Sequence, residues 1–139
     1  MEDDEDDIFF MKRALKAAHI ANPLYVVEDG NEAVNYLAGM GRFSDRSTYP
    51  IPAVVFLDLK LPYKSGHDVL AWIRTQEQLK GIIVVVLTSS GEPSDIRRAY
   101  SLGARSYMVK PPGVDDLLEL EHAFKIKWMP PELSATVPA

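Results

Sequence analysis

The stretch VVFLDLKLPYKSGHDVL, residues 54–70, joins an apolar run to a helix-like segment, with a single aspartate between them. The run Ala53–Leu57 lacks polar alternation, and so does Ile82–Leu87. Unbroken apolar runs of this length are typical of strands that are covered on both faces of a parallel sheet. Asp58 therefore places a charge at the end of a buried strand, and a charge in that position suggests a functional role.

Two more short runs, Leu24–Val27 and Tyr107–Val109, are rich in valine and aromatic residues and predict further strands. Segments with helical periodicity separate the runs. These segments cover residues 6–19, 31–39, 66–76, 93–103 and 114–128. Strands that alternate with helices predict an α/β fold, with a doubly wound parallel sheet and helices on both faces.

The composition excludes several classes of protein. A chain of 139 residues fits one domain, expected over residues 1–128 with a tail at 129–139. The net charge is −5 and the basic residues are scattered, so no nucleic-acid partner is expected. The absence of cysteine excludes disulfides and thiol nucleophiles. No apolar run is long enough to cross a membrane and no signal peptide opens the chain, so we expect a cytoplasmic protein.

Polar residues stand where several predicted strands end. Asp58, Thr88 and Lys110 each follow an apolar run directly. Glu2 and Asp3 precede the first helix. In an open α/β sheet, ligands bind beyond the carboxyl ends of the strands, so we expect all five residues at one edge.

Such a cluster of carboxylates is tolerable only around a cation, because like charges repel. A hard ion such as Mg²⁺ suits oxygen ligands. A carboxylate beside Mg²⁺ and a lysine can attack a phosphoryl group and form an aspartyl phosphate. The metal, Lys110 and Thr88 would then hold the oxygens of the transferred group.

Four segments of the chain carry a resemblance to a known family. EDDEDD, LDLKLP with YKSG, LTSS and the KP of MVKPP resemble, in order and spacing, the response-regulator receiver domain (CheY-like), from Glu2 to about Trp128. The long loop at residues 39–52, LDLKLP and the short tail are most similar to the lone receivers paired with bacterial phytochrome histidine kinases. The resemblance implies a five-stranded, flavodoxin-like sheet of order 2-1-3-4-5.

The resemblance also implies a phosphorylation site with a metal. Asp58 would accept a phosphoryl group from a sensor histidine kinase. Mg²⁺ or Mn²⁺ would be held by Glu2, Asp3, Asp58 and the backbone carbonyl of Lys60, with Asp3 the more direct ligand of the acidic pair.

The same resemblance implies a set of switch residues. Thr88 would be the switch hydroxyl, Tyr107 the aromatic residue that changes rotamer, and Lys110 the ammonium that binds the phosphate. Ser89 is small enough to leave the site accessible, and the bond between Lys110 and Pro111 would be cis.

The implied protein is a signalling module and not an enzyme. Only eleven residues follow Trp128, so it would signal through protein contacts without a DNA-binding output domain. A homodimer would use the Pro93–Leu102 helix, the last strand and the last helix. The tail at residues 129–139 is expected either to be disordered or to reach across the dimer as an arm.

The family pattern has one departure in this chain. It places a central strand before the acidic pair, whereas here Met1 stands where the pattern has a valine. We therefore expect that the first strand is truncated and that the native protein begins upstream.

Three alternatives and one simpler explanation compete with a phosphorylated receiver. A phosphatase of the haloacid-dehalogenase type needs a second aspartate where Lys60 stands, and a flavodoxin-like FMN carrier needs a phosphate loop where EDDEDD stands. A degenerate receiver that only docks would not need the complete acceptor set. Acids at a helix start also pair with the helix dipole, and we expect this capping and dipole role for Asp4, Asp6 and Asp7.

Overall fold

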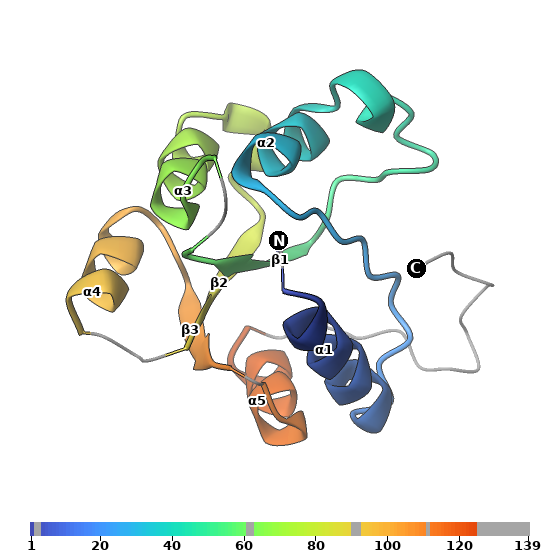
Figure 1. Ribbon diagram of the computed structural model, residues 1–139, viewed down its shortest axis with the longest axis vertical. Coiled ribbons are helices and arrows are strands. Elements are labelled where there is room, and N and C mark those ends of the chain that lie inside the picture. The colour runs from blue at the N-terminus through green and yellow to red at the C-terminus, as the bar shows by residue number, and fades with distance from the viewer. Residues whose placement is uncertain (2–3, 61–62, 90–92, 111, 125–139) are drawn as a thin grey trace.

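The computed structural model describes residues 1, 4–60, 63–89, 93–110 and 112–124. Its helices are α1 (Glu5–Ala17), α2 (Gly30–Ala38), α3 (Gly66–Arg74), α4 (Pro93–Ser101) and α5 (Val114–Phe124), and its strands are β1 (Val54–Asp58), β2 (Ile83–Thr88) and β3 (Ser106–Val109) (Figure 1). Short 3₁₀ turns cover Gly41–Phe43 and Glu77–Leu79. The predicted tail at residues 129–139 and the predicted end of the last helix at 125–128 lie outside the described residues.

Two of the helices begin at aspartates whose side chains bond to free backbone N–H groups. Asp4 caps α1, since its Oδ1 accepts from the N–H of Asp6 at 2.8 Å and of Asp7 at 3.3 Å. Asp29 caps α2 in the same way through the N–H of Glu32 at 2.8 Å. The capping role predicted for Asp4 is therefore confirmed.

The strands form a parallel sheet of order β1-β2-β3. Val84 and Val86 of the central strand belong to one hydrophobic cluster, and Val85 and Leu87 belong to another. All four are at most 5% exposed. Both faces of β2 are therefore covered, as predicted from its unbroken apolar run.

Helices cover the two faces of the sheet (Figure 1). On one face α2 and α3 pack together, with α4 beside α3, and on the other face α1 packs against α5. The apolar positions of each helix point to its own cluster, with Leu37 and Leu70 on the first face and Leu15 and Leu117 on the second. This arrangement confirms the predicted α/β fold with a parallel sheet and helices on both faces.

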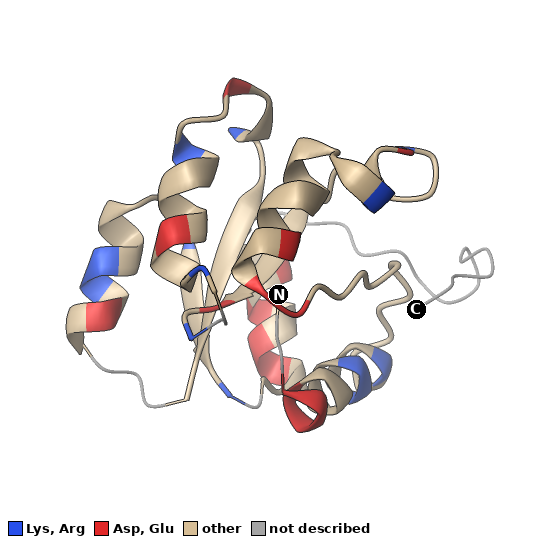
Figure 2. Ribbon diagram, turned by 45° about the horizontal axis from the view of Figure 1, so that its top comes forward, with Lys and Arg blue, Asp and Glu red and all other residues tan. Residues whose placement is uncertain are grey.

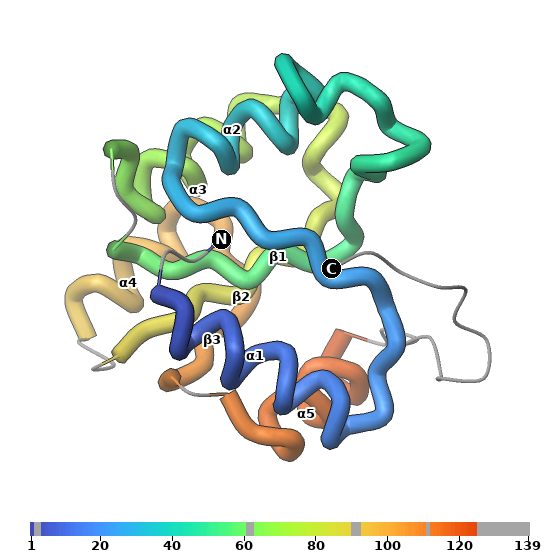
Figure 3. The backbone as a smooth tube through the Cα atoms, turned by 45° about the vertical axis from the view of Figure 1, so that its right-hand side comes forward, coloured from blue at the N-terminus to red at the C-terminus, as the bar shows by residue number. Residues whose placement is uncertain are grey.

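The predicted strand at Leu24–Val27 is not formed, and the described residues make three strands instead of the four that the sequence predicts within this chain. The segment runs beside β1 (Figure 3), and Val27 is only 4% exposed. Its composition therefore identified a buried segment correctly. A strand also needs a backbone partner, and no described strand pairs with this segment, so the prediction of a strand there is wrong.

Met1 bonds to the edge of β1 that faces this segment. Its terminal ammonium donates to the carbonyl of Phe56 at 2.9 Å, and its own carbonyl accepts from the N–H of Asp58 at 3.1 Å. An apolar groove of about 300 Å³ lies between β1 and the Leu24–Val27 segment. Met1 therefore takes part of the position where the family pattern places the first strand.

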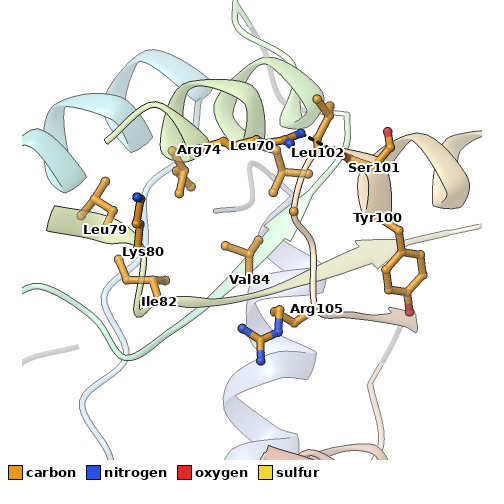
Figure 4. A pocket seen from close by; sticks show the side chains of 12 residues that line it. Leu70, Arg74, Leu79, Lys80, Ile82, Val84, Tyr100, Ser101, Leu102 and Arg105 are labelled. Carbon is orange, nitrogen blue, oxygen red and sulfur yellow. Dashed lines mark hydrogen bonds between the residues drawn. The ribbon is translucent and has the colours of Figure 1, made fainter. Parts of the chain in front are cut away.

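A second hollow lies between α3, β2 and the end of α4, and we call it the α3–α4 pocket (Figure 4). Its volume is about 370 Å³, and its lining includes Leu70, Val84 and Leu102. Arg74 donates from Nη1 to the carbonyl of Ser101 at 2.8 Å and so ties α3 to the last residue of α4.

Candidate functional site

The carboxyl ends of the three parallel strands meet at one edge of the sheet, which we call the carboxyl edge. Asp58 is the last residue of β1, Thr88 is the last residue of β2, and Lys110 follows β3. The backbone N–H of Lys110 donates to the carbonyl of Thr88 at 2.8 Å, so the ladder continues past the end of β3. The structure thus brings to one edge three residues that the sequence singles out.

Asp58 and Lys110 form a buried ion pair at this edge. Lys110 Nζ lies 2.6 Å from Asp58 Oδ2, and the two side chains are only 12% and 8% exposed. The other oxygen, Asp58 Oδ1, accepts from the backbone N–H of Lys60 at 2.9 Å. Burying charges is costly unless their partners are well placed, and here both carboxylate oxygens have a donor. The orientation of the Asp58 carboxylate is therefore fixed.

The glycine of the YKSG segment lets α3 begin close against the end of β1. A Cβ at Gly66 would lie 2.6 Å from the carbonyl oxygen of Asp58 and 2.6 Å from the Cα of Leu59. The N–H of Gly66 donates to the carbonyl of Leu59 at 3.0 Å, and the Ser65 hydroxyl caps the helix. Any side chain at position 66 would push the loop away from Asp58.

Asp7 belongs to the same ion-pair cluster, which the sequence analysis missed. Its Oδ2 lies 3.0 Å from Lys110 Nζ, so the helix-dipole role expected for it is incomplete. Asp7 precedes the buried Met11 and Ala14 by four and seven positions and shares their face of α1. The sequence could have indicated this contact through that spacing, because it places Asp7 on the buried face of α1, at the end of the helix near the carboxyl edge.

The remaining predicted switch residues lie at different depths. Thr88 is 8% exposed at the end of β2, and Ser89 beside it is exposed. Tyr107 in β3 is 43% exposed, and its ring meets that of Tyr100 on α4 edge to face, with centroids 6.3 Å apart. Tyr107 therefore lies on the outer face shared by β3 and α4.

The predicted metal ligands are only partly in view. Glu2, Asp3 and Pro111 lie outside the described residues. Within the described ranges, no group of three or more histidine, cysteine, aspartate or glutamate residues could hold a metal ion. The carboxylate of Asp58, with the backbone of Lys60 directly beside it, offers the oxygen chemistry that a hard divalent cation prefers. These oxygen donors fit a hard divalent cation if the predicted ligands Glu2 and Asp3 complete the site.

Acidic residues dominate the surroundings of this edge (Figure 2). They occupy the first turn of α1 and the first turn of the neighbouring α5. These residues are Glu5, Asp6, Asp7, Asp115 and Asp116. Negative charge at several points around one site favours the binding of a cation there.

Comparison with known proteins identifies the family. The family model named response regulator receiver domain matches residues 1–121, which is most of the chain. The chain belongs to the response regulator receiver family. No helix in the described part of this receiver is long and apolar enough to cross a membrane.

The relatives of this receiver include response regulators, and the names of some of them mention phytochromes. Response regulator Rcp1 of Synechocystis sp. is 32% identical over 139 residues, which is the whole of this chain and 90% of Rcp1. The bacteriophytochrome response regulator RtBRR is 39% identical with a TM-score of 0.81, over 95% of this chain and 82% of that one.

Two solved structures bear on the chemistry of the site. The Mn²⁺-bound form of Rcp1 has a TM-score of 0.74 at 32% identity and covers 100% of this chain and 96% of its own. The phosphorylated cyanobacterial phytochrome response regulator RcpA has a TM-score of 0.71 at 33% identity, over 100% of this chain and 95% of that one.

The family and these relatives confirm the predictions of a receiver, of a role in two-component signalling and of a likeness to phytochrome response regulators. Receivers are signalling modules that are phosphorylated on an aspartate, use a divalent metal and take a histidine kinase as partner. The prediction that the chain is not an enzyme is confirmed by this membership. The phosphatase and the FMN carrier, which belong to other families, are ruled out.

Proposed function

We propose that this receiver accepts a phosphoryl group from a sensor histidine kinase onto Asp58. One observation carries the proposal most directly. The Asp58 carboxylate is buried at the carboxyl end of β1 and lies between the ammonium of Lys110 at 2.6 Å and the N–H of Lys60 at 2.9 Å. A carboxylate held in one orientation, beside a cation that can pair with phosphoryl oxygens, is arranged for nucleophilic attack on phosphorus.

The chain's own residues supply most of the chemistry. A carboxylate oxygen of Asp58 forms the new bond to phosphorus, while the bond from phosphorus to the donor's leaving atom breaks. The ammonium of Lys110 offsets the negative charge on the transferred group. The hydroxyl of Thr88, at the end of the neighbouring strand, would bind a phosphoryl oxygen. This bond would couple the phosphorylation of Asp58 to a change in conformation.

We assign the metal to the same edge. Glu2 and Asp3, with Asp58 and the backbone carbonyl of Lys60, would hold Mg²⁺ or Mn²⁺. The carbonyl of Met1, which directly precedes the acidic pair, accepts from the N–H of Asp58 at 3.1 Å, and this contact supports the assignment. When bound, the ion supplies positive charge that lets the carboxylates and the phosphoryl oxygens lie close together.

The switch follows the family pattern in this proposal. Ser89 leaves the phosphoryl site open, the Lys110–Pro111 bond is cis, and Tyr107 changes rotamer when Thr88 engages the phosphoryl group. The exposed ring of Tyr107 against Tyr100 supports this role, because a ring that is 43% exposed can turn without opening the core.

The partner we propose is a histidine kinase of the bacteriophytochrome class. The names of RtBRR and RcpA support this assignment, since both are phytochrome response regulators. Kinase domains use ATP, so the encounter would take place in the cytoplasm. Phosphotransfer from a purified bacteriophytochrome kinase that exceeds transfer from an unrelated histidine kinase would support this pairing, and equal transfer from both would contradict it.

The output would pass through protein contacts, with α4, β3 and α5 as the surface of a homodimer. Large hydrophobic side chains are exposed on each of these elements. They are Tyr100, Tyr107, Val109 and Leu118, each between 43% and 49% exposed. An arm formed by residues 129–139 would extend this surface. Sedimentation velocity of the phosphorylated and unphosphorylated chain tests the dimer, and a monomer in both states would contradict it.

Phosphorylation itself is tested by incubation with a small phosphodonor and Mg²⁺, followed by intact-mass spectrometry. We expect the mass of one phosphoryl group to be added to the wild type. The gain should vanish in Asp58→Asn and when a chelator removes the metal. An equal gain in Asp58→Asn would overturn the assignment of the acceptor.

A further inference from the structure

Asp7 makes a contact at the carboxyl edge that the mechanism above does not use. Its Oδ2 lies 3.0 Å from Lys110 Nζ, the same nitrogen that lies 2.6 Å from Asp58 Oδ2. The two contacts span 103 and 52 positions of the chain. One ammonium group thus joins a carboxylate on α1 to a carboxylate at the end of β1.

Charge balance alone does not call for Asp7. The carboxylate of Asp58 already matches the single charge of Lys110, and a second carboxylate nearby adds repulsion. A lysine ammonium has three N–H donors, so one ammonium can serve both acids at the same time. Lys110 is only 12% exposed, so these protein contacts replace most of its contact with water.

Asp7 has a fixed position, whereas Lys110 has a flexible stem. The N–H of Asp7 donates to the capping Asp4 at 3.3 Å. Met11 and Ala14, on the same face of α1, are buried in the cluster shared with α5. A short side chain on a packed helix can therefore hold the end of a four-carbon chain that would otherwise sample many rotamers.

We propose that Asp7 is a positioning residue that holds the Lys110 ammonium at the carboxyl edge before and after Asp58 is modified. This inference rests on the proposed function of Asp58. When an oxygen of Asp58 becomes bonded to phosphorus, the ammonium turns toward the phosphoryl oxygens while its contact with Asp7 remains. Lys110 then needs little rearrangement, so the rate of phosphoryl capture depends on Asp7 through Lys110.

The first test compares Asp7→Asn with the matched control Asp6→Asn, using a small phosphodonor and Mg²⁺. Both changes remove one negative charge from the first turn of α1, but Asp6 is exposed and its N–H bonds to Asp4 within the helix cap. We expect Asp7→Asn to slow phosphorylation by about threefold to tenfold, the range for one partly exposed charged contact. Asp6→Asn should slow phosphorylation by less than about twofold, because the exposed charge of Asp6 adds only weakly to the negative field around the site. An Asp7→Asn rate equal to or above that of the wild type overturns the proposal.

The second test asks whether Asp7 acts through Lys110. In a Lys110→Met background, the further change Asp7→Asn should leave the slow rate unaltered, because the group that Asp7 positions is gone. The same threefold to tenfold loss in both backgrounds would mean that Asp7 acts independently of Lys110, and it would overturn the proposal.

A third test needs no phosphorylation. The ¹H–¹⁵N signal of the Lys110 ammonium, measured at low temperature, should be protected from exchange in the wild type and in Asp6→Asn, and lost in Asp7→Asn. An unchanged signal in Asp7→Asn overturns the proposal. A wild type that takes up no phosphoryl group would instead refute the proposed function, and the ammonium signal would still decide whether Asp7 holds Lys110.

Discussion

At the carboxyl edge of the sheet Lys110 and Asp58 are 12% and 8% exposed, whereas at the opposite edge the ion pair of Lys80 and Glu77 is 64% and 85% exposed. The second pair lies beside the α3–α4 pocket, where Lys80 is part of the lining (Figure 4). The two edges belong to the same sheet and carry the same kinds of charge. They differ in hydration, because the charges of the first ion pair are largely shielded from water and those of the second are not.

This difference in hydration distinguishes an ordinary surface ion pair from an ion pair at a functional site. An exposed pair such as Lys80 and Glu77 stabilises a protein by about 0.5 kcal/mol. Its charges stay largely hydrated, so little hydration free energy is lost when the pair forms. A buried pair such as Lys110 and Asp58 must offset the loss of hydration, and replacing it with apolar groups is often neutral for stability. Its presence is therefore better explained by chemistry at the carboxyl edge than by folding.

The largest effect on stability is expected from Lys110→Met, which leaves Asp58 buried beside Asp7 without its cation. The free energy of unfolding should fall by about 3 kcal/mol. Urea denaturation without divalent metal measures it. The double variant Asp58→Asn with Lys110→Met should recover much of the loss, because the most deeply buried carboxylate is then neutral and the remaining one, Asp7, is 26% exposed. A loss below about 1 kcal/mol for the single variant would show that the carboxyl edge behaves like an exposed surface.

A glycine at each edge gives a second comparison. Gly66→Ala would place a Cβ 2.6 Å from the carbonyl oxygen of Asp58, whereas a Cβ at Gly81, just before β2, meets nothing within 4 Å. We expect Gly66→Ala to lower the free energy of unfolding by about 2 kcal/mol and to slow phosphorylation. Gly81→Ala should change stability by less than about 1 kcal/mol and leave phosphorylation unaltered. Equal losses in the two variants would contradict the close approach of α3 to Asp58.

The smallest effect is expected at the α3–α4 pocket. Arg74→Ala removes the hydrogen bond to the carbonyl of Ser101 and should cost about 1 kcal/mol or less in the free energy of unfolding. The rate of phosphorylation should stay at the wild-type value, since Arg74 lies at the edge of the sheet away from Asp58. A clear change in that rate would mean that the two edges are coupled through α4.

Local pattern was enough to predict the central part of the fold. The apolar runs that end at Asp58 and near Thr88 became β1 and β2, because both faces of each strand could be covered by amphipathic helices. The run at Leu24–Val27 is also rich in valine and apolar residues, yet it did not become a strand. Strand formation depends on a backbone neighbour, and composition describes only the side chains.

The site was predictable in its strand ends but not in its helix. Asp58 and Lys110 could be placed together because parallel strands share an edge. Asp7 was missed because an acid in the first turn of a helix has a sufficient explanation in the helix dipole. Only the packing of α1 on the sheet shows that its face points at Lys110. The contact depends on how two elements meet, and no local pattern records that.

The most direct test of the central claim is to locate the phosphoryl group itself. After incubation with a small phosphodonor and Mg²⁺, borohydride reduction converts an aspartyl phosphate to homoserine, and peptide mass spectrometry then finds the altered position. We predict homoserine at position 58 alone, with none after metal is removed. Homoserine at position 7 or at another aspartate, with position 58 intact, would contradict the account.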